Sequence, residues 1–238
     1  MMPIRDANPS RKKPVVTFLI IFVNLVIFIF ETSMPHYLLE DFLKVFGFIP
    51  LMLTKSLLGV FSGNIEIYIL PIFTSMFLHG SWTHLISNMW ALWLFGDNVE
   101  DRMGHFKFLV FYLISGFIAA LVHYLFNFNS PVVTIGASGA IAGVMGAYFI
   151  MFPFARITTL IPLLWIPFFV DIPSFIYIGL WFISQISNGV LTLIGPLYGA
   201  GIAWWAHIGG FLYGAYVAPK YKRKRYYGYM DNYYGFFS

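Results

Sequence analysis

The sequence predicts an all-α membrane protein built as a bundle of six transmembrane helices. Of its 238 residues, 59% are hydrophobic and only 10% are charged, whereas soluble domains carry about 25% charged residues. A water-soluble fold could not bury this much apolar surface, so we expect the chain to be integral to a membrane. The charged residues are also unevenly placed, and the gaps between them indicate the number of spans.

Two long stretches contain no Asp, Glu, Lys or Arg: Phe108–Ala155 and Ile172–Pro219, of 48 residues each. Each stretch has room for two helices of about 20 residues and a short loop. Residues typical of turns divide the first stretch at Asn127–Pro131 and the second at Ser187–Gly189 and Gly195–Pro196. These stretches therefore predict the third to the sixth span.

Two further apolar segments, Val15–Phe30 and about Ser81–Asp97, complete the six spans. Basic residues precede the first of them, as in a signal peptide, but no small-residue cleavage site follows, so we expect an uncleaved helix. Ile157–Val170 contains two prolines and is predicted to be an interfacial connector before the fifth span. Glu31–Leu70 is a long first loop whose short apolar pieces are expected to be helices associated with the membrane.

The basic residues indicate the orientation of the bundle. Six spans place both termini on one side, which then carries 12 of the 14 Lys and Arg residues, and only Lys44 and Lys55 lie opposite. The positive-inside rule makes the first side cytoplasmic. We therefore expect a cytoplasmic segment 1–14, a membrane domain 15–218 and a basic, Tyr- and Gly-rich cytoplasmic tail 219–238. The run Lys220–Arg225 could also bind anionic lipid headgroups.

Composition also excludes several classes of function. The chain has no cysteine, so it forms no disulfide and no thiolate metal site. Its six histidines show no HExxH spacing, and no cofactor is expected. Because the basic residues cluster at the two ends, they indicate topology rather than binding of nucleic acid.

Polar side chains on three predicted spans lie at a similar depth. His84 and Asn88 are in the second span, Ser138 is in the fourth and His207 is in the sixth. At 1.5 Å per residue from the cytoplasmic flanks, His84, Ser138 and His207 lie about 24, 27 and 20 Å up. These levels overlap in the outer half of a hydrocarbon core of about 30 Å. Polar residues inside spans face a bundle interior or a watery cavity, so a common site is expected.

Small residues follow the fourth and sixth spans on one face of each. They are Gly139, Gly143 and Gly146 in the fourth span and Ala203, Gly210 and Gly214 in the sixth. Small residues about four positions apart let membrane helices approach closely. If the two faces meet, Ser138 and His207 come within reach of each other.

Such a contact would support acyl-transfer chemistry. A histidine beside a serine can take the hydroxyl proton, which a free serine does not readily give up near neutral pH. Asn88 follows His84 by one turn on the same face, so both could donate to a developing oxyanion together with the backbone N–H of Ser138. No carboxylate is placed to orient His207, so we expect a Ser–His dyad with the histidine held by packing.

Each of these features also has a structural explanation. The sequence Gly136-Ala137-Ser138-Gly139 in an apolar helix is more often a packing motif than a nucleophile. His207 could equally be a hydrogen-bonded structural histidine. We expect His79 to have a structural role at the interface, and the tryptophans to be interfacial anchors or bundle packing. The features support catalysis only when taken together.

Four segments resemble the rhomboid family of intramembrane serine proteases. FLHGSWTHLISNMWALWLFGDNVEDRMG is similar to the second span of that family, including its pattern of two histidines and an asparagine at His79, His84 and Asn88. GASGAIAGVMGAY is similar to the nucleophile segment, AHIGGFLYG to the last core helix and DIPSFIYIGLWFISQ to the fifth span. The resemblance covers residues 46–218 and implies a six-helix bundle of rhomboid type with a membrane-dipping first loop.

The resemblance implies that Ser138 is the nucleophile and His207 the general base, with His84 and Asn88 forming the oxyanion hole. It also implies that the protein hydrolyses peptide bonds in or near the transmembrane segments of membrane proteins. Some members have a tyrosine that stacks on the catalytic histidine where this chain has Ala142. The resemblance therefore leaves the brace for the His207 ring open.

A non-catalytic relative and a small transporter are the two alternatives to a protease. Inactive relatives lack the serine or the histidine, and this chain has both, which argues against a non-catalytic protein that binds transmembrane helices. The spans hold no paired carboxylates or charged relay, which argues against a small transporter. From the small six-span form and the lack of a targeting extension, we expect the plasma membrane of a bacterium.

Overall fold

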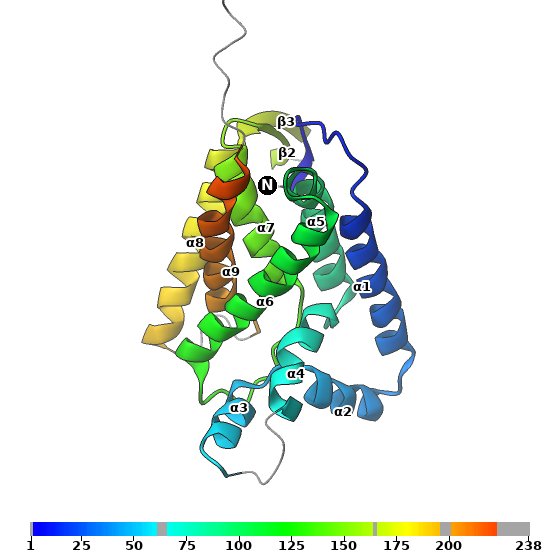
Figure 1. Cartoon of the computed structure of the whole chain (residues 1–238), viewed down its shortest axis with the longest axis vertical. Coiled ribbons are helices and arrows are strands. Elements are labelled where there is room, and N and C mark those ends of the chain that lie inside the picture. The colour runs from blue at the N-terminus through cyan, green and yellow to red at the C-terminus, as the bar shows by residue number, and fades with distance from the viewer. Residues whose placement is uncertain (1, 61–65, 164–165, 196–200, 223–238) are drawn as a thin grey trace, which may run out of the picture.

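Long helices run side by side through the molecule, with a small sheet at one end and short helices at the other (Figure 1). A computed structural model describes residues 2–60, 66–163, 166–195 and 201–222. The α-helices are α1 (Val15–Ser33), α2 (His36–Phe46), α3 (Pro50–Leu57), α4 (Glu66–Thr74), α5 (Trp82–Met103), α6 (His105–Asn127), α7 (Ser138–Met151), α8 (Ser174–Ile194) and α9 (Trp204–Val217). The remaining elements are the strands β1 (Met2–Asp6), β2 (Arg156–Leu163) and β3 (Ile166–Pro173) and the 3-10 helices η1 (Ser75–Phe77) and η2 (Ala218–Tyr221).

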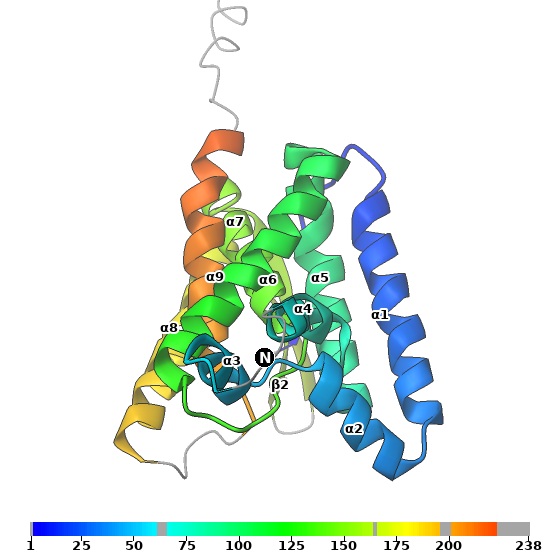
Figure 2. The same cartoon turned by 60° about the horizontal axis from the view of Figure 1, so that its bottom comes forward.

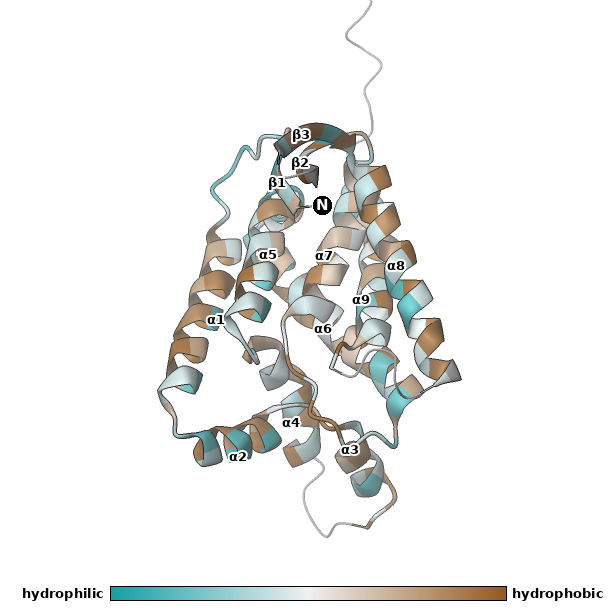
Figure 3. Ribbon diagram, turned by 180° about the vertical axis from the view of Figure 1, so that it is seen from behind, coloured by the Kyte–Doolittle hydropathy of each residue, from teal (hydrophilic) through white to brown (hydrophobic). Residues whose placement is uncertain are grey.

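Three of the described helices are long and apolar enough to cross a membrane: α1, α6 and Ser174–Leu193 of α8. Many large apolar residues of α1 and α8 are exposed, and the ribbons of both helices carry many residues coloured as hydrophobic in Figure 3. Exposed apolar residues are typical of helices that face lipid. The helices α7 and α9 have 14 residues each, or about 21 Å at 1.5 Å per residue. They are shorter than the hydrocarbon core of about 30 Å, so a side chain at the end of α7 can lie at membrane depth.

The helix α7 forms the centre of the bundle, since every residue from Gly139 to Tyr148 is buried. A Cβ atom added at Gly210 of α9 would overlap the carbonyl oxygen of Gly139, and one added at Gly214 would overlap that of Gly143. The two backbones therefore touch along the faces that the sequence predicts, and this part of the prediction is confirmed.

A β-hairpin occupies the segment that the sequence assigns to an interfacial connector, so the all-α prediction is wrong there. Strands β2 and β3 pair in antiparallel fashion, and β1 pairs antiparallel with the other side of β2. Alternate residues of β2, Ile157 and Thr159, are fully buried against the helices, as expected for a strand with one face on the core. Pro162 and Pro167, which favoured a connector, lie opposite each other beside the hairpin turn.

Strand β1 fastens the N-terminal segment to the bundle. The Asp6 carboxylate oxygen Oδ2 accepts hydrogen bonds from the Tyr148 hydroxyl (2.7 Å) and from Nδ2 of Asn98 (2.8 Å). The indole N–H of Trp90 donates to the backbone oxygen of Pro3 at 2.7 Å. Burial raises the pKa of Asp6 to about 6, and the bond from Tyr148 opposes this shift. The strand thereby joins α5 to α7 at the end of the bundle that lies away from Ser138.

The first loop contains the helices α2, α3 and α4, as the short apolar pieces predict, and they lie at the end of the bundle opposite the sheet (Figure 1), which comes forward in Figure 2. No residue of α2 is buried. Backbone bonds pair Phe48 in this loop with Thr134, at N···O distances of 3.0 and 2.7 Å. The first loop therefore holds the extended segment that leads into α7.

The predicted turns have different outcomes. Helix α6 ends at Asn127, as predicted, but α8 runs unbroken through Ser187–Gly189, where a turn was expected. The Ser187 hydroxyl and the Asn188 amide donate to carbonyl oxygens four residues earlier, at 3.0 and 2.8 Å. These polar side chains are satisfied within the helix, so they do not end it. The other predicted turn falls where α8 ends, and Pro196 lies outside the described residues.

Candidate active site

Ser138 is the first residue of α7, and the backbone just before it packs closely against the side chain of His84. Gly136 has a φ of 123°, a conformation that residues with a Cβ rarely adopt. A Cβ atom there would lie 2.7 Å from Nε2 of His84. The backbone N–H of Gly136 also donates to the carbonyl oxygen of Ser75 at 2.8 Å. Glycine therefore lets the chain pass against His84 and turn into the helix that carries the serine.

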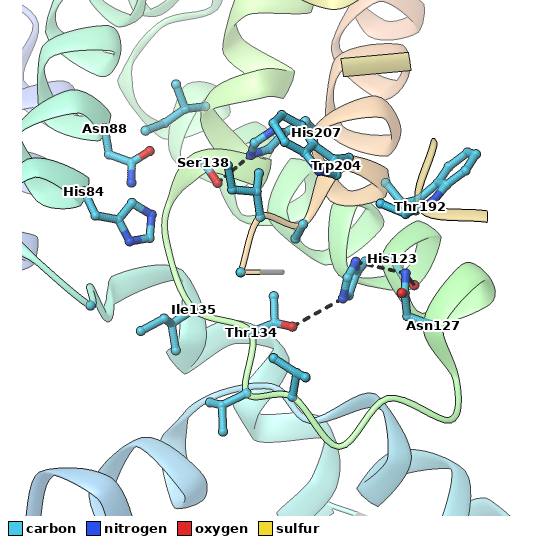
Figure 4. Close-up of a pocket in the computed structure, with 18 of the residues that line it drawn as sticks. His84, Asn88, His123, Asn127, Thr134, Ile135, Ser138, Thr192, Trp204 and His207 are labelled. Atoms are coloured by element: carbon cyan, nitrogen blue, oxygen red, sulfur yellow. Dashed lines mark hydrogen bonds between the residues drawn. The ribbon is translucent and has the colours of Figure 1, made fainter. Parts of the chain in front are cut away.

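Ser138 and His207 lie in direct contact. Nε2 of His207 is 2.8 Å from the hydroxyl oxygen of Ser138, and the two side chains point toward each other in Figure 4. The predicted approach of these residues, which are 69 positions apart, is confirmed. The glycine seam between α7 and α9 is the contact of Gly210 and Gly214 with Gly139 and Gly143. It brings Ser138 and His207 together, because neither helix has a side chain there that would hold the backbones apart.

Gln185 of α8 sets the hydrogen-bonding role of His207. Its oxygen Oε1 is 2.8 Å from Nδ1 of His207, and its Nε2 donates to the Trp181 carbonyl oxygen (3.1 Å) and the Ser184 hydroxyl (2.8 Å). Because the amide nitrogen is used on α8, Oε1 accepts from Nδ1–H, and Nε2 of the imidazole is left to accept from Ser138. Gln185 thus selects the tautomer that a general base requires.

The expectation that packing alone holds His207 is therefore wrong. Gln185 lies within the segment that resembles the fifth rhomboid span, and it is the sole glutamine of the sequence. A lone amide in an apolar span was the available signal, since such groups tend to face the bundle interior. Aromatic rings add to the brace: Trp181 and Trp204 have ring centroids 5.9 and 6.2 Å from that of His207. They surround the imidazole where Ala142 offers no aromatic ring.

His84 and Asn88 of α5 line the same cavity as Ser138 and His207. Asn88 is 6% exposed, and its Nδ2 is buried with no hydrogen-bond partner among the described residues. An amide donor that faces a cavity in this way is available to a ligand oxygen. Figure 4 places both side chains on the α5 side of Ser138, away from His207. The serine hydroxyl therefore lies between a proton acceptor on one side and hydrogen-bond donors on the other.

The cavity has a volume of about 820 Å³ and a second polar wall. Nε2 of His123 lies 3.3 Å from the Thr134 hydroxyl, and the Asn127 amide donates to the carbonyl oxygen of His123 at 3.0 Å. No role was predicted for His123, although it is the only ionisable residue other than tyrosine between Phe108 and Ala155. The site is thus a polar chamber inside an apolar bundle.

His79, for which a structural role is predicted, is not among the described residues that line this cavity. It is 3% exposed, and its ring centroid lies 5.0 Å from that of His84. Within the described part of the chain, no three His, Cys, Asp or Glu side chains gather closely enough to hold a metal ion.

Comparison with known proteins identifies the family. The model of the Rhomboid domain matches residues 66–224, which is more than half of the chain. The chain belongs to the rhomboid family. This family includes intramembrane serine proteases, and membership makes the chain a multi-pass membrane protein with a helical bundle.

Relatives of this rhomboid come from plants, bacteria and fungi. It is 29% identical over 211 residues to RHOMBOID-like protein 1 of Arabidopsis thaliana, covering 76% of this chain and 54% of the relative. It is 38% identical over 96 residues to the putative rhomboid protease YdcA of Bacillus subtilis (40% and 45%). It is 28% identical over 169 residues to the mitochondrial Rhomboid protein 1 of Saccharomyces cerevisiae (66% and 44%). The chain spans about half or less of the length of these curated relatives.

Proposed function

We propose that this rhomboid is a serine endopeptidase that cuts membrane proteins in or near their transmembrane segments. The observation that carries the proposal is the 2.8 Å hydrogen bond between Nε2 of His207 and the hydroxyl of Ser138. A serine bonded to an imidazole whose other nitrogen is held in place has the geometry of an activated nucleophile. In this family the natural targets of such a nucleophile are peptide bonds of membrane proteins.

The reaction would proceed through an acyl-enzyme. The Ser138 oxygen attacks the carbonyl carbon of the scissile bond while its proton moves to Nε2 of His207. The negative charge that develops on the carbonyl oxygen is stabilised by the side chains of His84 and Asn88 and by the backbone N–H of Ser138, which has no partner within its own helix because Ser138 is the first residue of α7. His207 then gives its proton to the departing amine, and a water activated by the same nitrogen hydrolyses the ester.

We also propose that α1, α5, α6, α7, α8 and α9 all cross the membrane, so that residues 15–218 form a six-span domain. The sheet and η2 lie at one end of the bundle and α2–α4 at the other (Figure 1). Lys44 and Lys55 belong to the α2–α4 end, and the basic residues of β1, β2 and η2 lie at the sheet end. This distribution supports a cytoplasmic sheet, cytoplasmic termini and a first loop on the outer membrane surface.

The basic run Lys220–Arg225 remains a proposed contact for anionic headgroups on that cytoplasmic side. Its first residues follow α9 directly, whereas Arg223–Arg225 and the rest of the tail to residue 238 lie outside the described residues.

The test of the proposal is covalent labelling of the purified protein in detergent with a fluorophosphonate, which reacts with activated serines. Wild type should label, whereas Ser138→Ala and His207→Ala should not. Ser187→Ala is the matched control, because it removes an exposed hydroxyl of α8 whose one hydrogen bond among the described residues lies within its own helix. Equal labelling of wild type and Ser138→Ala would reject the assignment of the nucleophile.

Cleavage of a substrate with a single transmembrane helix then tests the endopeptidase activity. Wild type should release two fragments cut near the outer end of the helix, since a helical peptide bond must unwind before it can be attacked. Labelling without any cleavage of such substrates would contradict the proposed substrate class. Binding of a transmembrane helix with neither labelling nor cleavage would favour the non-catalytic alternative.

A further inference from the structure

A buried carboxyl group lies close to the candidate site but has no part in the mechanism above. Glu31, in the last turn of α1, is 1% exposed. It also lies outside the residues 66–224 that match the family model. Acidic residues within membrane helices are costly and tend to serve a function. The contacts of Glu31 indicate what that function is.

Glu31 holds the short link of residues 78–81, which joins η1 to α5. Its Oε2 accepts a hydrogen bond from the backbone N–H of His79 at 3.3 Å. Its Oε1 and both ring nitrogens of His79 are buried and have no hydrogen-bond partner among the described residues. The ring of Phe28, one turn earlier on α1, meets His79 and Trp82 edge to face, at centroid distances of 6.5 and 4.9 Å. The last two turns of α1 therefore contact His79 within the link and Trp82, which follows it.

The same link positions His84. The ring of His79 packs against that of His84 with the centroids 5.0 Å apart and the planes at 66°. The Ser81 hydroxyl, at the N-terminus of α5, accepts a hydrogen bond from the backbone N–H of His84 at 3.1 Å. A shift of the link would therefore move the His84 ring, which lies against Gly136 two residues before the serine.

We propose that Glu31 is a positioning residue that holds His79, and through it the His84 ring, in the orientation needed to stabilise the oxyanion. This inference rests on the proposed function. Glu31 itself does not line the cavity, so its effect must pass through His79 and His84. Because oxyanion stabilisation acts in the transition state, loss of Glu31 should lower kcat and leave KM almost unchanged.

The experiment compares variants of the full chain in detergent with a single-span substrate. Glu31→Leu has a similar volume and no acceptor, whereas Glu31→Gln keeps a carbonyl oxygen that can accept from the His79 N–H. Deleting one oxyanion donor costs about 100- to 1000-fold in kcat, so a displaced donor should cost about 10-fold. We expect that loss in Glu31→Leu, with KM within about twofold, and near wild-type kcat in Glu31→Gln. Glu40→Leu is the matched control, because Glu40 is exposed on α2 and, in the part of the chain that the structure describes, pairs with His36 alone.

A peptide aldehyde provides a readout that a loss of stability alone would not move. Its adduct with the serine carries an oxyanion, so its affinity should fall in Glu31→Leu by the same factor as kcat, measured on protein that retains the wild-type melting curve. His79→Ala covers the case in which Glu31→Leu does not fold, since it keeps the backbone N–H for Glu31 and removes the ring that contacts His84. It should show the same loss of kcat.

The outcomes separate this inference from the proposed function. Wild-type kcat and aldehyde affinity in folded Glu31→Leu, or in His79→Ala, would overturn the inference while leaving the protease assignment intact. Equal losses in Glu31→Gln and Glu31→Leu would overturn the role of the hydrogen bond to His79. A wild-type protein that neither labels nor cleaves would overturn the proposed function and the inference together.

Discussion

Replacing Gln185 by leucine should expose how much of the activity depends on the tautomer of His207. The change removes the acceptor 2.8 Å from Nδ1 and keeps a buried side chain of similar size. A buried donor left without a partner costs about 1–3 kcal/mol. The imidazole can avoid this cost by moving its proton to Nε2, where it can no longer accept from Ser138. If the whole cost falls on the reactive tautomer, kcat should drop by about 5- to 150-fold, at 1.36 kcal/mol per factor of ten.

The assay is steady-state cleavage of a single-span substrate, together with the rate of fluorophosphonate labelling. Both rates should fall in Gln185→Leu, while KM and the melting temperature change little. Asn188→Ala is the control, because it removes an amide on the same helix that, among the residues described, bonds to the Ser184 carbonyl oxygen alone. Labelling and kcat of Gln185→Leu within twofold of wild type would refute the role assigned to Gln185.

Three further predictions concern the seam, the turn before Ser138 and the N-terminal strand. Gly210→Ala should lower the melting temperature and abolish labelling, because its Cβ overlaps the Gly139 carbonyl and such overpacking costs about 1–3 kcal/mol; Gly195→Ala, where a Cβ meets nothing within 4 Å, should do neither. Gly136→Ala should lower the melting temperature, because a residue with a Cβ is strained at a φ of 123°, and it should also lower the labelling rate, since the new methyl presses on the His84 ring; an unchanged labelling rate would contradict this. Folding raises the pKa of Asp6 from 3.8 to about 6, so the native state binds the proton more tightly. The free energy of unfolding should therefore fall as pH rises from about 4 to about 6. The melting temperature of Asp6→Asn should not show this fall over the same pH range.

The sequence was sufficient to predict the parts of the site that depend on helical periodicity. Residues at four-residue spacing share a face whatever surrounds the helix, so Gly210 and Gly214 could be assigned to a contact face. Counting residues from the charged flanks then placed Ser138 and His207 at compatible depths. Both steps use geometry internal to a helix, and the observed contact between the two side chains agrees with them.

The features that were missed depend on relations between distant segments. Which polar group meets Nδ1 of His207 is decided by how α8 packs against α9. An amide in an apolar span indicates that Gln185 faces the bundle interior, but the local sequence does not indicate which residue it contacts. The sheet was missed because Pro162 and Pro167 were interpreted as breaks, whereas they lie opposite each other beside a hairpin turn. The pairing of β2 with β1, some 150 residues away, gives no local signal.

The attachment of β1 has a practical consequence for handling the protein. Pro3 and Asp6 bond to Trp90, Asn98 and Tyr148. An affinity tag or fluorescent fusion attached directly to the N-terminal end of β1 would therefore disturb the hydrogen bonds that hold this strand to α5 and α7. A fusion at the C-terminus would leave these hydrogen bonds unchanged. A purification strategy that leaves the first residues untouched should give the more homogeneous and longer-lived preparation.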